Sequence, residues 1–270
     1  MTKTIGFLGG GNMASALIGG LLSNELYQPE NIYTSVATKK SVDRLIKQFG
    51  IKAALDSHQV IKSSDIVVIA VKPYMVTELL TDLKNDFRPG QVIVSIASGI
   101  TLDQLKRLLP EQKIYRAMPN TPASVGKGMT SLATMLSDSE GSRESVTELF
   151  KAVGEVAWIS EKLMHAAIAV HGSSPAYVFM MIEAMADGAV LEGMPRDKAY
   201  LMAAQSLIGA ATMVLESGLH PGALKDQVTS PGGNTIAAIS VLEATGFRSS
   251  IISAIHAAAE KSREMEAGKL

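Results

Sequence analysis

A glycine-rich turn near the start of the chain has the residue types that can hold a phosphate group. An apolar run at residues 4–8 leads into Gly9, Gly10, Gly11, Asn12, Met13 and Ala14, in the pattern G-x-G-x-x-A. The first glycine permits a tight turn, the second lets a pyrophosphate approach the backbone, and Ala14 lets a helix pack on the strand. Free amides at the start of that helix favour negative charge. The pattern predicts a dinucleotide site, against the alternative of a glycine turn without a ligand.

The end of the second apolar run bears on which dinucleotide would bind. An NAD site usually places Asp or Glu about 20 residues after the glycines, where it binds the ribose 2′-hydroxyl. Residues 34–40 read Thr-Ser-Val-Ala-Thr-Lys-Lys and contain no acid. Hydroxyls such as that of Ser35, together with Lys39 and Lys40, would instead suit a 2′-phosphate. We therefore expect NADPH, with NADH as the alternative; the other interpretation of the two lysines is a solvated helix start.

Two later strand ends are expected at the same crevice, because ligands of such sheets bind outside the carboxyl ends of the strands. Val71 and Lys72 end one apolar run, and Pro73 suits the first turn of a following helix. Ala97 and Ser98 end another run, where small residues would let a nicotinamide ring lie close to the backbone. From position alone, Lys72 is equally well an exposed cation.

Two segments of the second half fit a purely structural role poorly. Residues 171–177 form a small, hydroxyl-rich break between apolar helices. Residues 226–235 contain Ser-Pro-Gly-Gly before a predicted helix, which gives a run of exposed amides at its positive end. The second segment is a candidate carboxylate site, and a simple capping turn is the alternative.

The elements that would position these residues change character along the chain. Val- and Ile-rich runs at 4–8, 32–36, 66–71, 92–96 and 114–118, with weaker ones at 129–134 and 156–159, alternate with helical stretches. This predicts a doubly wound parallel sheet, the Rossmann architecture of an α/β fold, in residues 1–160. Residues 161–270 read as an all-α domain, with predicted helices at 161–170, 175–192, 196–216, 235–244 and 247–266.

Composition excludes several classes of protein. The formal net charge of −1 argues against a nucleic-acid partner, and the absence of cysteine excludes disulfides and thiolate-bound metal. The apolar stretch 201–215 is shorter than the ~20 residues that span a bilayer, so we expect no membrane segment. Residues 199–204 have almost no polar face, which favours a homodimer built through the helical half over helices that merely pack on the first domain. No metal site is expected.

Several motifs together resemble those of pyrroline-5-carboxylate reductases, in order and spacing, over essentially the whole chain. They lie at residues 9–14, 70–73, 118–121, 172–177 and 226–235, and Ser-Pro-Gly-Gly-x-Thr is the most specific of them. The resemblance implies an oxidoreductase that transfers hydride from NAD(P)H to the C=N carbon of Δ1-pyrroline-5-carboxylate and gives L-proline, the last step of proline biosynthesis. It also implies a cytoplasmic enzyme and an interlocked dimer, in many members assembled into a decamer.

The same resemblance assigns roles to individual residues. Thr235 matches the threonine that hydrogen-bonds the ring nitrogen and assists its protonation, so it is the expected catalytic residue. Backbone amides around Ser230, Gly233 and Asn234 would hold the substrate carboxylate, and Glu161 matches an acidic position near the substrate. The residues expected to touch the cofactor are Gly9 to Ala14, Ser35, Ala37, Val71, Lys72, Pro73, Ala97 and Ser98, and Lys39 is added from the charge argument above.

The chain departs from the family pattern at a few positions. His171 stands where Ser or another small residue is usual, and Gln227 and Asn234 replace a common Asn and a common Thr or Ala. Two alternatives stay open: an NADP-dependent 3-hydroxy acid dehydrogenase, which has a similar domain plan, and a non-catalytic dinucleotide-binding homologue, which the unusual His171 keeps open. The first would require a catalytic lysine on an interdomain helix, and Lys162 is a weak candidate.

Overall fold

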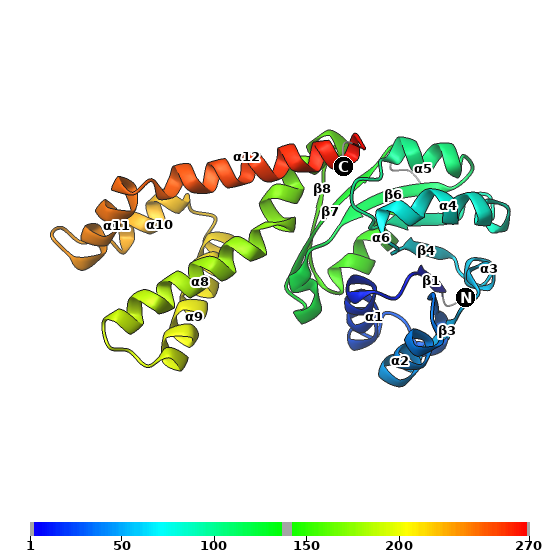
Figure 1. Cartoon of the computed structure of the whole chain (residues 1–270), viewed down its shortest axis with the longest axis horizontal. Helices are drawn as coiled ribbons and strands as arrows, with labels where there is room; N and C mark the ends of the chain where they lie inside the picture. Colours follow the sequence, from blue (N-terminus) through cyan, green and yellow to red (C-terminus); the bar gives the residue numbers. More distant parts are fainter. Residues whose placement is uncertain (1–2, 137–141, 269–270) are drawn as a thin grey trace. The chain divides into compact units, whose positions relative to one another are not determined.

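The computed structural model describes residues 3–136 and 142–268, and its first part is an eight-stranded sheet (Figure 1). The strand order is β3-β2-β1-β4-β5-β6-β7-β8. The strands are β1 (Ile5–Leu8), β2 (Ile32–Ser35), β3 (Lys52–Ala54), β4 (Ile66–Ile69), β5 (Val92–Ser95), β6 (Lys113–Met118), β7 (Gly128–Thr134) and β8 (Gly154–Trp158). The chain therefore reverses its direction of growth across the sheet between β1 and β4, which is where ligands of such sheets bind.

Pairing is parallel from β3 to β6, as the sequence predicts, and antiparallel between β6 and β7. The connection between β6 and β7 contains the 3-10 turn η3 (Thr121–Val125) instead of a helix. A parallel crossover needs a connection of about a dozen residues or more, usually a helix, so this short link turns the strand back. The expectation of parallel pairing is thus wrong for β6 and β7, whereas β7 and β8 pair in parallel.

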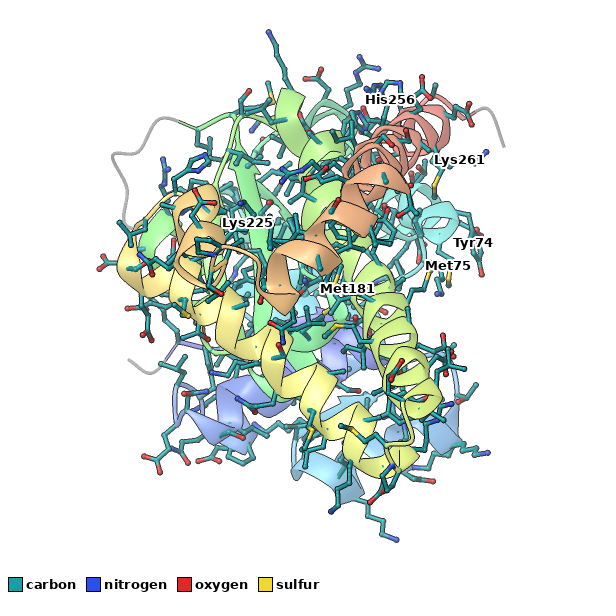
Figure 2. The ribbon with its side chains drawn as sticks, turned by 90° about the vertical axis from the view of Figure 1, so that its left-hand side faces the viewer. Tyr74, Met75, Met181, Lys225, His256 and Lys261 are labelled. Carbon is teal, nitrogen blue, oxygen red and sulfur yellow. The ribbon has the colours of Figure 1, made fainter. Side chains whose placement is uncertain are left out.

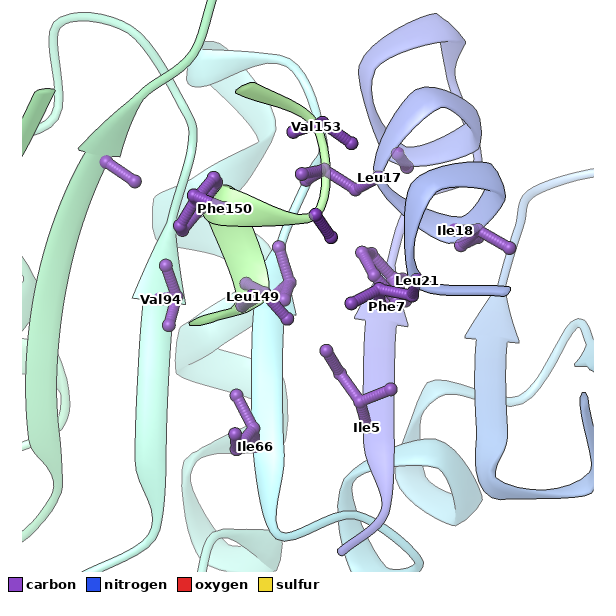
Figure 3. Close-up of a cluster of buried hydrophobic side chains, with 14 of the residues drawn as sticks. Ile5, Phe7, Leu17, Ile18, Leu21, Ile66, Val94, Leu149, Phe150 and Val153 are labelled. Carbon is purple, nitrogen blue, oxygen red and sulfur yellow. The ribbon is translucent and has the colours of Figure 1, made fainter. Parts of the chain in front are cut away.

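Helices cover both faces of the sheet. They are α1 (Asn12–Ser23), α2 (Lys39–Phe49), α3 (Ser57–Lys62), α4 (Pro73–Leu83), α5 (Leu102–Leu108) and α6 (Ser142–Lys151), with 3-10 turns η1 (Pro29–Asn31) and η2 (Lys84–Asp86). On one face Ile5 and Phe7 of β1 pack with Leu17 of α1 and Phe150 of α6 (Figure 3). On the other, Leu8 packs in a cluster with residues of α3, α4 and α5. Because both faces are buried, the central strands are almost continuously apolar.

The segment after β8 is not the single helix that the sequence predicts for residues 161–170. It consists of η4 (Glu161–Leu163), α7 (Met164–Ala167) and the π-helix η5 (Ile168–Gly172). At its end the amide of Ser173 donates to the carbonyl of Ile168 at 2.9 Å, the wider spacing of a π turn. Asn120 donates to the carbonyl of His171 at 2.9 Å, so a side chain from the sheet side satisfies a backbone group in this turn.

The chain divides into two compact units. The first contains residues 1–173 and 258–270, and the second residues 174–257. The second is all helical, with α8 (Ser174–Leu191), α9 (Arg196–Ser217), α10 (Pro221–Gln227), α11 (Asn234–Ala244) and the start of α12 (Phe247–Glu266). The end of α12 belongs to the first unit. The expected functional boundary between residues 160 and 161 stays a prediction.

Large apolar side chains are exposed along the helices of the second unit. Leu191 is 87% exposed and Leu215 is 80% exposed. In the part of the chain that the structure describes, α9 is long and apolar enough to cross a membrane, as would be the bent pair α11–α12 if it counted as one span. So large an apolar surface requires a partner of some kind.

Candidate active site

The glycine turn lies between β1 and α1, and each glycine has a different environment. Gly9 has a φ of +108°, and a Cβ there would lie 2.6 Å from the carbonyl oxygen of Ala70. A Cβ on Gly10 would lie 2.6 Å from Val36. A Cβ on Gly11 would meet nothing within 4 Å, and no side chain caps the first turn of α1. The turn therefore leaves open space beside free amides at Gly11, as a bound pyrophosphate requires.

At the end of β2 the predicted residues differ in accessibility. Ser35 is buried, and its Oγ lies 2.9 Å from the Oγ of Ser57, so this hydroxyl already has a partner. Ala37 and Lys39 are exposed, and the Nζ of Lys39 lies 3.3 Å from Asp43. Sequence analysis missed Asp43, whose charge partly offsets that of Lys39.

Arg44 of α2 is a second residue that sequence analysis missed. Its Nη2 donates to the carbonyl of Gly10 at 2.6 Å, and its Nη1 donates to the Oγ of Ser15 at 3.4 Å. Arg44 thus ties α2 to the glycine turn. In the sequence, Arg44 looks like any exposed arginine of a helix, so this contact could not be predicted.

The carboxyl ends of β4 and β5 lie at the same edge of the sheet as the glycine turn, because these strands are parallel to β1 and in register with it. Val71 and Lys72 follow β4, and Pro73 begins α4. Lys72 is exposed, as are Tyr74 and Met75 on the first turn of α4 (Figure 2). Ala97 is buried after β5, and its amide donates to the Oγ of Ser95 at 3.3 Å. The sheet therefore brings the predicted cofactor residues to one edge.

The predicted carboxylate loop belongs to the second unit and leads into α11. Gly232 has a φ of +68°, and the amide of Gly233 donates to the carbonyl of Ser230 at 3.1 Å. Gly233 is the N-cap of α11, and no side chain caps the first amides of this helix, which include those of Asn234 and Thr235. Ser230 and Asn234 are exposed, and Thr235 is half-buried. This is the arrangement of amides expected of an anion site.

Glu161 and His171 are both held by neighbours in the first unit. The Oε1 of Glu161 accepts from the amide of Leu102 and from Arg116 Nη1, each at 2.8 Å. The Nε2 of His171 lies 2.8 Å from the Oγ of Ser131 on β7. Burial lowers the pKa of His171, so its neutral form is favoured. Within residues 3–136 and 142–268, no group of three or more His, Asp or Glu side chains is placed to hold a metal ion.

Comparison with known proteins extends these observations to the whole chain. Residues 161–265 match the family model described as pyrroline-5-carboxylate reductase dimerisation, and residues 4–99 match that of NADP oxidoreductase coenzyme F420-dependent. The chain is 47% identical over 266 residues to a pyrroline-5-carboxylate reductase of Escherichia coli, covering 98% of this chain and 99% of that one. The chain belongs to the pyrroline-5-carboxylate reductase family.

Solved structures of family members agree with the fold. A pyrroline-5-carboxylate reductase from Coxiella burnetii superposes with a TM-score of 0.91 at 34% identity, covering 98% of this chain and 99% of that one. One from Plasmodium falciparum, with NADP bound, superposes with a TM-score of 0.88 at 30% identity and 98% coverage of each chain. The resemblance and the fold class inferred from sequence are confirmed. The match of residues 161–265 to a dimerisation domain also indicates that the chain oligomerises.

Proposed function

We propose that this chain reduces the C=N bond of Δ1-pyrroline-5-carboxylate to L-proline with hydride from NADPH, the last step of proline biosynthesis. The observation that carries the proposal is the 47% identity to a reductase of this name over nearly the full length of both chains. The geometry supports it, because a dinucleotide turn and an uncapped helix start suited to a carboxylate are both present. Reduction of an imine needs alignment, a carboxylate clamp and a proton source, and no activated nucleophile.

The residues of the first unit would bind and orient the cofactor, which supplies the hydride. The open space at Gly11 and the amides that begin α1 fit a pyrophosphate. Val71, Lys72 and Pro73 at the end of β4, and Ala97 and Ser98 at the end of β5, would line the nicotinamide end.

NADPH is proposed over NADH because the end of β2 carries cations and no acid. Lys39 and Lys40 occupy the first turn of α2, where the helix dipole disfavours positive charge. A 2′-phosphate nearby would offset that cost. Ala37 is exposed there, whereas Ser35 is buried, with its hydroxyl bonded to Ser57 and its carbonyl accepting from the amide of Gly9.

The residues of the second unit would bind the imino acid. The amides of Asn234 and Thr235, in the loop that contains Ser230 and Gly233, would hold the carboxylate, because the amide of Gly233 already donates to the carbonyl of Ser230. The hydroxyl of Thr235 would hydrogen-bond the ring nitrogen and assist its protonation, and Glu161 would lie near the substrate.

The assembly we propose is a homodimer through the helical unit, with a decamer as a further assembly, in the cytoplasm and without a nucleic-acid or membrane partner. The exposed side chains of Leu191 and Leu215 support this proposal, because a second copy of the chain would cover them with apolar side chains of its own. Light scattering of the purified chain tests the number of copies. The two alternatives from the sequence, a hydroxy acid dehydrogenase and a non-catalytic homologue, are not favoured by the comparisons.

A steady-state assay tests the function. Purified protein should oxidise NADPH, followed by its absorbance, when pyrroline-5-carboxylate is added and not before, and it should do so more slowly with NADH. The matched control is the same mixture without the imine, in which the absorbance of NADPH should stay constant. Absence of turnover with pyrroline-5-carboxylate and with its six-membered homologue, from protein that binds NADPH, would overturn the proposal in favour of the non-catalytic homologue.

A further inference from the structure

Arg116 is a buried charge in the middle of the sheet, and it contacts two carboxylates. Its side chain is 3% exposed. Nη1 donates to the Oε1 of Glu161 at 2.8 Å, and Nη2 donates to the Oε2 of Glu266 at 3.0 Å. Burying an ion costs several kcal/mol unless good partners satisfy it. Well-packed apolar side chains in place of Arg116 and its two carboxylates would avoid this desolvation cost. Stability alone therefore does not explain why a charged group is buried here.

The contacts of Arg116 converge on the loop between β5 and α5, which is the loop that contains Ala97 and Ser98. Arg116 is the register partner of Ser95 on β5, and the Oγ of Ser95 accepts from the amide of Ala97. Glu161, which Arg116 holds, accepts from the amide of Leu102 at the start of α5. Both ends of the loop are therefore fixed by Arg116 or by its immediate neighbours.

The middle of the loop lies against the C-terminal end of α12. Gly99 has a φ of +77°, and a Cβ there would lie 4.0 Å from the backbone of Met265 and Glu266. His165 fixes the same stretch of α12, because its Nδ1 lies 2.9 Å from the Oγ of Ser262 and its Nε2 lies 3.4 Å from Glu266. Ser262 is 8% exposed, so it is a buried partner in this contact and not an accessible nucleophile.

We propose that Arg116 is a positioning residue for hydride transfer, which holds Glu161 and Glu266 so that the β5–α5 loop keeps the shape that receives the nicotinamide end of the cofactor. This inference rests on the proposed function, because that function supplies the nicotinamide. The planar guanidinium suits the task, since it presents separate N–H groups to two carboxylates in a rigid fork, which a lysine cannot do. The same contacts hold the last turns of α12 to the first unit.

Different contacts hold the two ends of the cofactor site. The glycine turn is built by β1 and α1, and no contact of Arg116 described above reaches it. Loosening the β5–α5 loop should therefore spare binding of the adenine and pyrophosphate groups and impair placement of the nicotinamide. A misplacement of about 1 Å at a reacting centre can cost on the order of 10²-fold in rate.

The first experiment compares two glutamates of α12 in the full-length protein. Glu266 contacts Arg116, whereas Glu264, two residues earlier, forms an exposed ion pair at 2.9 Å with Lys261. Glu266→Ala should lower kcat with pyrroline-5-carboxylate by roughly 10- to 100-fold, and Glu264→Ala should leave it within twofold. Glu266→Gln, which keeps an acceptor for Arg116, should restore most of kcat.

A second measurement does not need turnover. Dissociation constants are measured for NADPH and for 2′-phospho-ADP-ribose, the same molecule without nicotinamide. Glu266→Ala and Arg116→Lys should weaken NADPH and leave the fragment within twofold. Leu149→Ala, a buried change on α6, serves as the control for lost stability, because it should lower the Tm without separating the two ligands.

The outcomes distinguish the two proposals. If wild-type protein fails to reduce the imine, the proposed function is wrong, while the two dissociation constants still test the positioning role. If Glu266→Ala keeps wild-type kcat, or if Glu266→Ala and Arg116→Lys weaken the fragment as much as NADPH, Arg116 is merely structural and the inference is overturned. If Arg116→Lys does not fold, Glu266→Ala carries the test alone.

Discussion

Gly11→Ala is the sharpest test of the cofactor site, because the structure predicts that it affects binding and spares the fold. Gly11 has a φ of −73° and a ψ of −173°, a conformation that alanine adopts without strain, and its Cβ would meet no atom of the chain within 4 Å. Replacing glycine by alanine at such a position stabilises a protein by about 0.4–1 kcal/mol through the unfolded state. Gly11 is also the N-cap of α1, where alanine is less favourable than glycine by a comparable amount, so the Tm of Gly11→Ala should stay close to that of the wild type.

Cofactor affinity, by contrast, should fall. The added methyl group occupies the space through which a pyrophosphate approaches the free amides of α1, so at least one amide–phosphate hydrogen bond is lost. A hydrogen bond to a charged group contributes about 1.5–3 kcal/mol, which corresponds to roughly a 10- to 150-fold increase in Kd. The assay is NADPH binding by calorimetry or fluorescence, beside a thermal melt of the same sample.

Two further glycines serve as controls. Gly19→Ala, in the middle of α1, would place a Cβ 3.6 Å from Phe49, an ordinary contact, and should raise the Tm without affecting NADPH. Gly9→Ala should lower the Tm strongly, because its Cβ would lie 2.6 Å from a backbone oxygen at a positive φ. A Gly11→Ala protein that binds NADPH like the wild type would refute the assignment of this turn to the pyrophosphate.

Three more predictions follow from the remaining site residues. Thr235→Ala should lower kcat at least tenfold and leave the Kd of NADPH within twofold, whereas Thr235→Ser should keep most of kcat; equal loss in both variants would remove the hydroxyl from the mechanism. Lys39→Glu should weaken NADPH roughly fivefold more than NADH, and Lys47→Glu at the other end of α2 should not discriminate between them. The pKa of His171 is lowered below 6.5 by burial, so the unfolded chain binds the proton more readily and stability falls as pH drops below about 6.5. In melts from pH 8 to pH 5.5, the Tm of His171→Gln should fall less than that of the wild type. The Tm of His58→Gln should fall more, because hydrogen bonding to Asp86 raises the pKa of His58, so its protonated form stabilises the folded chain at low pH. Equal slopes in all three proteins would contradict this.

Much of the sheet could be predicted because burial on both faces leaves a strong pattern. Residues 66–69 are apolar without interruption, since β4 lies between β1 and β5 with helices above and below. By contrast, β3 was missed, because Lys52, Ala53 and Ala54 lie at an edge where few side chains are buried. The antiparallel β7 also could not be read from its residues, since its direction is set by the length of the preceding turn.

The candidate site divides in the same way. The glycine turn could be predicted from the sequence because its glycines meet local requirements of the backbone. The loop before α11 could be predicted because its motif resembles that of a known family. The partners of the predicted residues could not be found, because they come from distant positions: Ser57 beside Ser35, Arg44 beside Gly10 and Ser131 beside His171. Pairing of this kind depends on the fold as a whole and leaves no periodicity in the chain.

Arg116 shows what a violation of a local pattern can indicate. In Lys113–Met118 an arginine stands among residues that are otherwise apolar or at the strand ends, and sequence analysis assigned it no role. The structure shows that it is buried with two carboxylates whose positions lie 45 and 150 residues away. Natural chains tend to break local rules where function requires it. A buried charge whose partners hold the β5–α5 loop is a better candidate for a positioning role than for a source of stability, because an apolar substitute would have given stability at lower cost.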